Sequence, residues 1–407
     1  MVTIEHVHNI PVFGDPLYDA VDQMEFLIAP TADFVALMAD HHLGYSMPIG
    51  GVAGYIGKIS PSGVGYDIGC GNKAVRLDIR ADSIDITAIM DEIWDTLSFG
   101  VGLKNTAETV SHDVLDRRGR HAAAWDIVAA ISKENGKGIS GLHDMACGQL
   151  GTVGGGNHYV DVFSDEDGYV WIGVHFGSRG LGHKIATHFI KAAGGKDGIN
   201  SSPAIMAADS ELGIQYIKCM TLAGEYAYAG RDWVCDTVAR IIGGTITDSV
   251  HNHHNFAWKE THGGKEMWMI RKGATPAFPG QRGFIGGSMG ENAVIIEGVD
   301  SDLSKAAGYS TVHGAGRVLS RSEAKGKIHR KTGRIIKEGV VSREMMDEWM
   351  WNAGVVLRGG GQDESPHCYK RLPDVLNAHE GTIRTAHTLT PLGVAMAGAD
   401  TIDPYKD

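Results

Sequence analysis

The 407-residue sequence lacks long apolar runs, paired cysteines and an excess of positive charge. No stretch of 18 apolar residues occurs, so we expect no transmembrane helix, and His6, His8 and Asp15 interrupt the apolar run that a signal peptide needs. The five cysteines are irregularly spaced and form no CxxC pair, which argues against a disulfide framework and for a reducing compartment. We therefore expect a cytoplasmic protein that does not act at a membrane.

The formal net charge of −12 argues against broad, non-specific binding of nucleic acid. The segment from Arg317 to Lys337 differs, because it holds eight basic residues and the single acid Glu323. This segment predicts a solvated basic helix or hairpin. A phosphate-facing role is the alternative, since the run starts inside the motif VHGAGR at 312–317.

Glycine is abundant, with 56 residues, about double its usual ~7% share. In GVGYDIGCG at 63–71, Asp67 and Cys70 lie three residues apart among four glycines. Thiolate and carboxylate are both metal ligands, so this loop is either half of a metal site or a glycine turn without a ligand. Later histidine motifs could complete such a site: GGGNH ending at His158, VHFGSRG with His175, HNHHN with His253 and His254, and VHGAGR with His313.

The segments YVDVF (159–163) and YVWIGVHF (169–176) are rich in β-branched and aromatic residues, and the turn signal SDEDG separates them. We expect an antiparallel hairpin in which 163 faces 170 and His158 faces His175. Directly opposed residues have Cβ atoms roughly 5 Å apart, which suits two ligands of one metal or of two neighbouring metals. A slip of one residue would put the two histidines on opposite faces. Structural histidines at strand ends are the alternative.

Apolar residues spaced by three and four predict helices at 86–97 and 121–133, and the interval 185–243 is also expected to be helical. A further helix is expected at 345–351. The motif-bearing loops fall between these helices, so a shared site requires that the loops converge. We therefore expect one large α+β domain spanning 1–407, with mixed or antiparallel sheets, flanking helices and glycine-rich loops around one metal site. It would include a largely helical insertion at about 185–243 and a C-terminal tail at about 399–407.

Taken together, eight ordered motifs resemble the RtcB family of RNA ligases, and they extend over most of the chain. They are HHLGYSMPIGGVAGY (41–55), GVGYDIGCG (63–71), GTVGGGNHYVDV (151–162), VHFGSRGLG (174–182), HHNFAW (253–258), RKGATPAFPGQRGFIGGSMG (271–290), STVHGAGRVLSR (310–321) and DESPHCYK (363–370).

The resemblance implies an enzyme of tRNA splicing or RNA repair that joins an RNA 3′-phosphate or 2′,3′-cyclic phosphate to a 5′-hydroxyl. It implies GTP and two Mn²⁺ ions as cofactors. It also implies an archease-like activator as a partner. The implied guanylylated residue is His313, and the implied metal ligands are Asp67, Cys70, His158, His175 and His254, with the Cys70 thiolate shared between the ions. The implied nucleotide contacts are Asn157, His158, Tyr159, Val160, Asp161, His254, Asn255, Gly286, Gly287, Ser288, Met289, His313, Gly314, Ala315 and Gly316. Arg179 and Arg317 are the implied RNA phosphate contacts.

The sequence departs from the family pattern at several positions expected to contact the nucleotide. Asp161 replaces a usual Glu, Gly286 replaces a usual proline, and Ala293 replaces a serine. Met396 lies near the position of a lysine that contacts guanine, and Lys406 could substitute only if the tail folds back. We therefore expect a relaxed nucleotide preference or weaker GTP binding.

Two other functions remain open at this stage: a metal-dependent phosphodiesterase or phosphatase acting on RNA ends, and a non-catalytic RNA-binding protein. The VHGAGR motif favours the ligase, because a hydrolase needs no nucleotidylated histidine. The five metal-ligand positions argue against a non-catalytic RNA-binding protein, because such a protein does not need them. Ligand type leaves the metal open, since a site of sulfur, nitrogen and oxygen atoms generally binds zinc more tightly than manganese.

Overall fold

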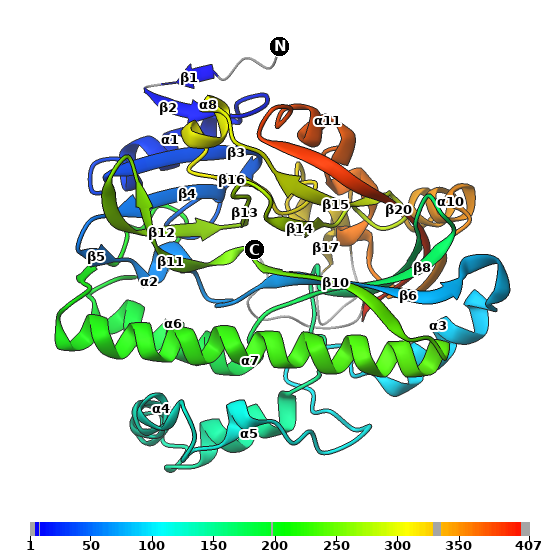
Figure 1. The fold of residues 1–407 in the computed structure, drawn as a ribbon, viewed down its shortest axis with the longest axis horizontal. Coiled ribbons are helices and arrows are strands. Elements are labelled where there is room, and N and C mark those ends of the chain that lie inside the picture. The colour runs from blue at the N-terminus through cyan, green and yellow to red at the C-terminus, as the bar shows by residue number, and fades with distance from the viewer. Residues whose placement is uncertain (1–4, 8, 197, 329–334, 400–407) are drawn as a thin grey trace.

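Two large β-sheets lie above a layer of long helices in the computed structural model (Figure 1). The structure describes residues 5–7, 9–196, 198–328 and 335–399. The predicted tail at 399–407 falls almost entirely outside these residues, as does Lys406. Within the described part of the chain, no helix combines the length and apolar character needed to cross a membrane.

The first sheet has six strands, and all neighbours in it are antiparallel except β2 and β3. Its order is β1 (Glu5–Val7), β2 (Ile10–Val12), β3 (Phe34–His42), β4 (Ile49–Tyr55), β12 (Lys265–Lys272) and β11 (Asn255–His262). Strand β3 matters most for the site, because its buried half carries Asp40.

The second sheet has eight strands and is antiparallel apart from the pairing of β19 (Val356–Gly360) with β20. The order of its other strands is β10 (Ile246–His253), β6 (Gly71–Arg80), β8 (Tyr169–Phe176), β7 (Tyr159–Ser164), β20 (Ile383–Gly398), β15 (Ala293–Gly298) and β14 (Arg282–Ile285). Short two-stranded pairs complete the set: β13 (Ala274–Pro276) with β16 (Ser310–Val312), β17 (Gly326–Ile328) with β18 (Ile335–Glu338), and β5 (Lys58–Ile59) with β9 (Met206–Ala207). The predicted α+β class with mixed and antiparallel sheets is confirmed.

The predicted hairpin forms, but its register was predicted wrongly by one residue. Tyr159, not His158, pairs with His175, and Ser164 pairs with Val170. His158 precedes the first residue of β7, so the alternation of side chains along the strand does not govern its direction. The two histidines still meet, with ring centroids 5.4 Å apart.

The helices follow the apolar spacing closely. The predicted helices at 86–97, 121–133 and 345–351 are α3 (Ile86–Thr96), α4 (Ala122–Glu134) and α10 (Arg343–Ala353). The stretch 185–243 is occupied by most of α6 (Arg179–Ala192), by β9 and by α7 (Glu211–Ile242).

The other helices of the described residues are α1 (Tyr18–Gln23), α2 (Pro61–Val64), α5 (Gly141–Gln149), α8 (Asp302–Ala306), α9 (Arg321–Lys325) and α11 (Leu372–Asn377). The single-turn elements are η1 (Met24–Ile28), η2 (Ala81–Ser83), η3 (Asp113–Leu115), η4 (Gln362–Glu364) and η5 (Pro366–Cys368).

Helix α7 connects the two halves of the core. At 32 residues it is about 48 Å long, and it runs beneath β6 and β8 in Figure 1. Its N-terminal half packs with α4, α5 and α6 in one buried cluster, to which Met220 and Tyr226 belong. Its C-terminal half packs with α3 and the second sheet in another, to which Val234 and Val238 belong. The helix therefore supports the strands that carry the site.

The basic segment starting at Arg317 forms the short helix α9 and the β17–β18 pair, so it contains both of the predicted element types. The prediction that the segment is solvated is wrong for Arg317, Arg321 and Lys325, whose side chains are mostly buried against acids. Its lysines and arginines at 330, 331 and 334 lie outside the described residues. Arg321 pairs with the buried carboxylates of Asp363 and Glu364, and Lys325 lies 2.7 Å from Asp363. Much of the charge in the described part of this segment is thus compensated within the protein.

Candidate functional site

The ends of three neighbouring strands bring the candidate ligands together. Cys70 immediately precedes β6, His175 lies near the end of β8, and His254 follows the end of β10. Because β6 is antiparallel to both neighbours, these three ends share one edge of the sheet. The His254 amide donates to the Cys70 carbonyl at 2.8 Å, which continues the pairing one residue past the strand.

The loop before β6 places Asp67 beside Cys70. The hydroxyl of Ser60 caps α2 by accepting from the Gly63 amide, and the Cys70 amide closes the following turn by donating to the Asp67 carbonyl at 3.0 Å. A Cβ at Gly177 would lie 2.2 Å from Asp67 Oδ1, so only glycine leaves room for this carboxylate.

Cys70, His158 and His175 form a group that could hold a metal ion, with one ligand atom from each lying within 4.8 Å of the others. Cys70 Sγ is 3.2 Å from His175 Nε2 and 3.7 Å from His158 Nε2. Asp67 Oδ2 lies 3.1 Å from His158 Nε2. All three members of the group are buried. The structure therefore brings four predicted ligands into one cluster.

His254 extends this cluster toward His313. Its ring centroid is 5.0 Å from that of His175 and 4.8 Å from that of His313. Its Nδ1 is buried without a hydrogen-bond partner among the described residues, and burial lowers the pKa of this imidazole well below its usual value. A neutral imidazole has a lone pair on one of its two ring nitrogens that a metal ion can bind, so the donor set fits a metal.

Cys70 and Asp67 differ in their protonation. Burial, and then the charge of Asp67, raises the pKa of the Cys70 thiol well above its usual value. Burial alone would also raise the pKa of Asp67, but the hydrogen bond from His158 and the charge of Arg179 outweigh it and lower that pKa. A metal bound by Cys70 must therefore displace the thiol proton, while Asp67 is already a carboxylate.

Arg179 holds the other nitrogen of His158, with Nη1 3.0 Å from Nδ1. Because a guanidinium only donates, His158 Nδ1 accepts here and the ring proton is on Nε2, directed at Asp67. A metal on Nε2 of the neutral ring would move that proton to Nδ1, where it faces the arginine donor. Metal binding through Nε2 therefore requires Arg179 to leave Nδ1.

Asp40 orients His313, and sequence reasoning missed it. Its Oδ2 accepts from His313 Nδ1 at 2.6 Å, from the His313 amide at 2.9 Å and from the Gly314 amide at 3.3 Å. Burial would raise the pKa of Asp40, but the charge and hydrogen bonds of His313 lower it. In its neutral form, with the proton on Nδ1, His313 has a lone pair on Nε2. An acid within the apolar strand FVALMADHH was the available signal.

The other predicted nucleotide positions lie around this centre. Tyr159 packs against His175 with ring centroids 5.3 Å apart, and Asp161 is on the same face of β7. Val160 instead packs into the cluster shared with α3 and α7. Asn255 accepts from the Gly273 amide, and Ser288 donates to Glu291. Asn157 directly precedes the ligand His158.

The loop 286–289 approaches Tyr159 closely. A Cβ at Gly286 would lie 2.1 Å from the Tyr159 hydroxyl, which is buried and has no hydrogen-bond partner among the described residues. Glycine at position 286 therefore leaves room for the tyrosine hydroxyl. A Cβ at Gly287 would lie 2.5 Å from the Asn292 carbonyl oxygen, and Met289 lies in an apolar cluster with Tyr159 and Met396.

Beyond His313, the Gly314 amide contacts Asp40, Ala315 is buried, and Gly316 lies against the Asp40 backbone. Arg317 donates to the Tyr369 hydroxyl at 2.8 Å and to the Asp363 carbonyl at 2.8 Å, and it lies 3.4 Å from Glu364. The guanidinium is thus already engaged.

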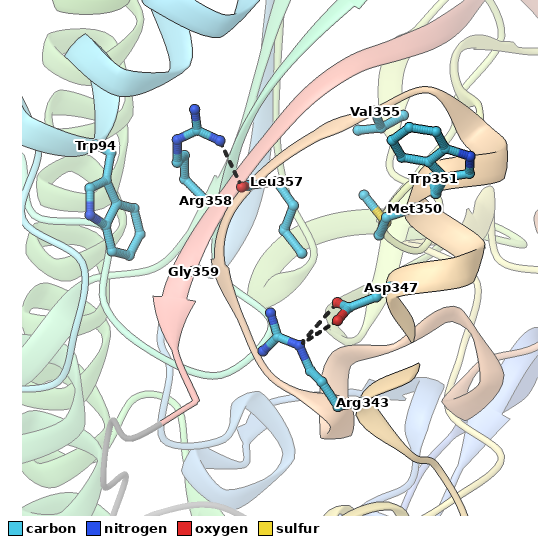
Figure 2. Close-up of a pocket in the computed structure, with 9 residues that line it drawn as sticks. All are labelled: Trp94, Arg343, Asp347, Met350, Trp351, Val355, Leu357, Arg358 and Gly359. Atoms are coloured by element: carbon cyan, nitrogen blue, oxygen red, sulfur yellow. Dashed lines mark hydrogen bonds and ion pairs between the residues drawn. The ribbon is translucent and has the colours of Figure 1, made fainter. Parts of the chain in front are cut away.

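A separate pocket of about 430 Å³ lies beside α10 and β19 (Figure 2). Arg343 pairs with Asp347, and Arg358 pairs with Asp91. Because both arginines are neutralised, this pocket has no unpaired positive charge from them to attract a phosphate. The cluster around Cys70 is the stronger candidate for the functional site.

Comparison with known proteins assigns this arrangement to a family. A family model described as tRNA-splicing ligase RtcB matches residues 27–397. A tRNA-splicing ligase RtcB of Archaeoglobus fulgidus is 30% identical over 458 aligned residues, which cover 93% of this chain and 91% of that protein. An RNA-splicing ligase RtcB of Escherichia coli K12 is 30% identical over 414 residues, covering 94% of both chains. An RNA-splicing ligase RtcB of Mycobacterium tuberculosis is also 30% identical, covering 88% of this chain and 95% of that protein.

Proposed function

Because the chain belongs to the RtcB family of RNA-splicing ligases, we propose that it joins an RNA 3′-phosphate or 2′,3′-cyclic phosphate to a 5′-hydroxyl, using GTP. The observation that carries this proposal is the pairing of His313 with Asp40 beside the cluster of Cys70 and its histidines. A hydrolase could also use a histidine oriented in this way, as a general base, so transfer of guanylate to His313 is the step that distinguishes the ligase.

In the proposed reaction His313 Nε2 attacks the α-phosphorus of GTP. An N–P bond forms, the bond to the bridging oxygen breaks, and pyrophosphate leaves. The proton stays on Nδ1, where the Asp40 carboxylate stabilises the developing positive charge of the ring. A 2′,3′-cyclic phosphate is first opened by water to a 3′-phosphate. An oxygen of the RNA 3′-phosphate then attacks the guanylate, which breaks the N–P bond and frees His313. The 5′-hydroxyl finally loses its proton to solvent, attacks the activated 3′-phosphate and displaces GMP.

Asp67, Cys70, His158, His175 and His254 would hold the two Mn²⁺ ions that we propose, with Cys70 as the central ligand of the set. When bound, such ions neutralise phosphate charge and orient attacking and leaving oxygens. Arg179 would contact the RNA phosphate after it leaves His158, and Arg317 would do so after exchanging its present partners. The remaining nucleotide contacts are proposed at 157–161, 254–255, 286–289 and 313–316.

We place this activity in one domain spanning the chain, with the helical stretch 185–243 as an insertion in it. The physiological setting we propose is tRNA splicing or RNA repair in the cytoplasm, with an archease-like protein as a candidate activator. Its RNA substrates carry a 3′-phosphate or 2′,3′-cyclic phosphate and a 5′-hydroxyl.

The proposal is tested by incubating the protein with Mn²⁺ and α-labelled GTP, then adding RNA with a 3′-phosphate and a 5′-hydroxyl. Labelled protein followed by ligated RNA supports the ligase. Phosphate release without protein labelling would instead identify a phosphatase or phosphodiesterase. RNA retention with neither activity would identify a binding protein.

Replacing Asp40 with asparagine is expected to slow guanylylation of His313 about 10- to 100-fold, because the imidazolium loses its carboxylate partner. The measurement is the labelling rate at saturating GTP, with Asp33→Asn as the control, since Asp33 directly precedes β3 and its exposed carboxylate accepts from the Ile56 amide, away from His313. Equal rates for Asp40→Asn and the unmodified protein would refute the orienting role.

The nucleotide end of the site is expected to discriminate weakly between GTP and ATP. Burial raises the pKa of Asp161 well above its usual value, and its Oδ1 has no partner among the described residues. A neutral carboxyl group both donates and accepts, so it matches the two donors of guanine less well than a carboxylate would. Met396, opposite Tyr159 in β20, brings no charge to offset this.

We therefore expect Met396→Lys to increase the preference for GTP over ATP by roughly 10- to 100-fold, the value of one charge-assisted hydrogen bond. Competition labelling with the two nucleotides measures it. Thr390→Lys is the matched control, because it adds the same charge to an exposed position of β20 opposite Ser164. A strong GTP preference in the unmodified protein would contradict the prediction.

A further inference from the structure

Arg231 of α7 is completely buried directly behind the candidate metal ligands. Its Nη1 donates to the carbonyl of Gly69 at 3.0 Å and to the carbonyl of Phe176. Its Nε donates to His251 Nε2 at 2.9 Å, and its guanidinium lies 5.3 Å from the centroid of the Tyr228 ring. One planar side chain therefore contacts several segments of the protein.

Those contacts fall next to the ligands. Gly69 immediately precedes Cys70, and Phe176 immediately follows His175. Arg231 Nη2 also lies 3.0 Å from Nδ1 of His253, the neighbour of His254. The guanidinium thus touches the residue adjacent to a predicted ligand in three separate segments, although it touches none of the predicted ligands themselves.

A second buried arginine shows what is unusual about Arg231. Arg271 is equally inaccessible to solvent, but its guanidinium makes paired hydrogen bonds to the carboxylate of Glu260 at 2.7 and 3.0 Å. Among the described residues no carboxylate accepts a hydrogen bond from Arg231. A buried charge without a counter-ion is costly, so a purely structural role would favour an uncharged side chain here.

Burial lowers the pKa of Arg231, while Tyr228, Cys70, Asp232 and Asp67 act in the opposite direction. Within the described residues the hydrogen bonds of the guanidinium go to backbone carbonyls and histidines, and none of these four groups accepts one. A rigid fork of donors reaches two carbonyls in fixed geometry, which a lysine ammonium on a flexible stem does not reproduce.

We propose that Arg231 is a positioning residue that sets the separation of Cys70 and His175 by clamping the carbonyls of Gly69 and Phe176. This inference rests on the metal centre of the proposed function. It adds that the centre is organised from behind by α7, through backbone contacts, before any metal arrives.

The clamp is tested first without metal, by hydrogen exchange of the metal-free protein. Arg231→Lys is expected to speed amide exchange at least tenfold in peptides covering 67–72 and 174–180. Arg271→Lys is the matched control, because it makes the same substitution at the other buried arginine. It should speed amide hydrogen exchange around 258–262 and 308–311 instead. Unchanged exchange at 67–72 and 174–180 in a folded Arg231→Lys protein would overturn the proposal.

The consequence for the ligands is tested with Co²⁺ as the probe, because its thiolate charge-transfer and d–d absorption bands report ligand geometry. Arg231→Lys is expected to weaken Co²⁺ binding at least tenfold and to shift these bands, whereas Arg271→Lys lowers the melting temperature without shifting them. Identical spectra and affinities in the two variants would leave Arg231 only a structural role. Neither arm measures ligation, so failure of the RNA chemistry is distinguishable from failure of the clamp.

If Arg231→Lys does not fold, the test uses NMR of the unmodified protein with ¹⁵N-labelled arginine. A guanidinium clamped by two carbonyls should give slowly exchanging Nη protons whose resonance shifts when Zn²⁺ is added. A rapidly exchanging resonance, or one insensitive to Zn²⁺, would exclude the clamp.

Discussion

Replacing His313 with alanine is expected to abolish covalent labelling by GTP, with a loss of roughly 10³-fold or more, and to abolish RNA joining with it. The reason is geometric. His313 Nδ1 is held by Asp40 at 2.6 Å, so Nε2 is the free nucleophile, and alanine offers nothing in its place. Labelling with α-labelled GTP in the presence of Mn²⁺, resolved on a denaturing gel, measures this directly.

Two comparisons make that result specific. His387→Ala removes a histidine of β20 that pairs with Glu166, and it should label normally. The His313→Ala protein should still bind Co²⁺, because Cys70, His158 and His175 are in place without it. Persistent labelling of the His313→Ala protein would show that the nucleophile lies elsewhere.

Replacing Cys70 with alanine is expected to reduce metal binding, guanylylation and ligation together, each by roughly 10²-fold or more. Cys70 lies 3.2 Å from His175 and 3.7 Å from His158, so its sulfur is at the centre of the ligand set. Because burial raises the pKa of this thiol, metal binding releases a proton, and apparent affinity should strengthen as the pH rises.

Cys219→Ala is the control, since it removes another fully buried thiol, on α7, that lies outside the ligand cluster. It should label at the rate of the unmodified protein. Normal labelling of the Cys70→Ala protein would refute the assignment of Cys70 as a ligand shared between two ions.

Local sequence patterns predicted the elements of this fold well. Strand β8 occupies the predicted residues 169–176, and α3 differs from its prediction by one residue. The hairpin register failed because His158 lies before the strand, where a loop and not the pleat sets the direction of the side chain. Proximity of the two histidines survived this error since the glycine-rich loop returns His158 to the same edge.

Contacts between distant segments were not predictable. Asp40 and His313 are 273 residues apart, and nothing in either segment specifies the other. Arg231 lies in a segment that the apolar spacing predicted to be helical, but that spacing did not predict its contact with the loop of Gly69. The basic run at Arg317 likewise gave no sign that Asp363 and Glu364 compensate part of it, because those acids lie more than 40 residues downstream.

The wide spacing of the site along the chain has a consequence for biosynthesis. Asp40 comes from an early strand, Cys70 and His175 from the next sheet, and His313 from a late loop. Closing such long segments costs chain entropy before any contact compensates for it, so we expect Asp40 and His313 to meet late in folding. Under the proposed mechanism, a nascent chain that still lacks residue 313 has no histidine to react with GTP, so guanylylation has to follow synthesis of this late loop.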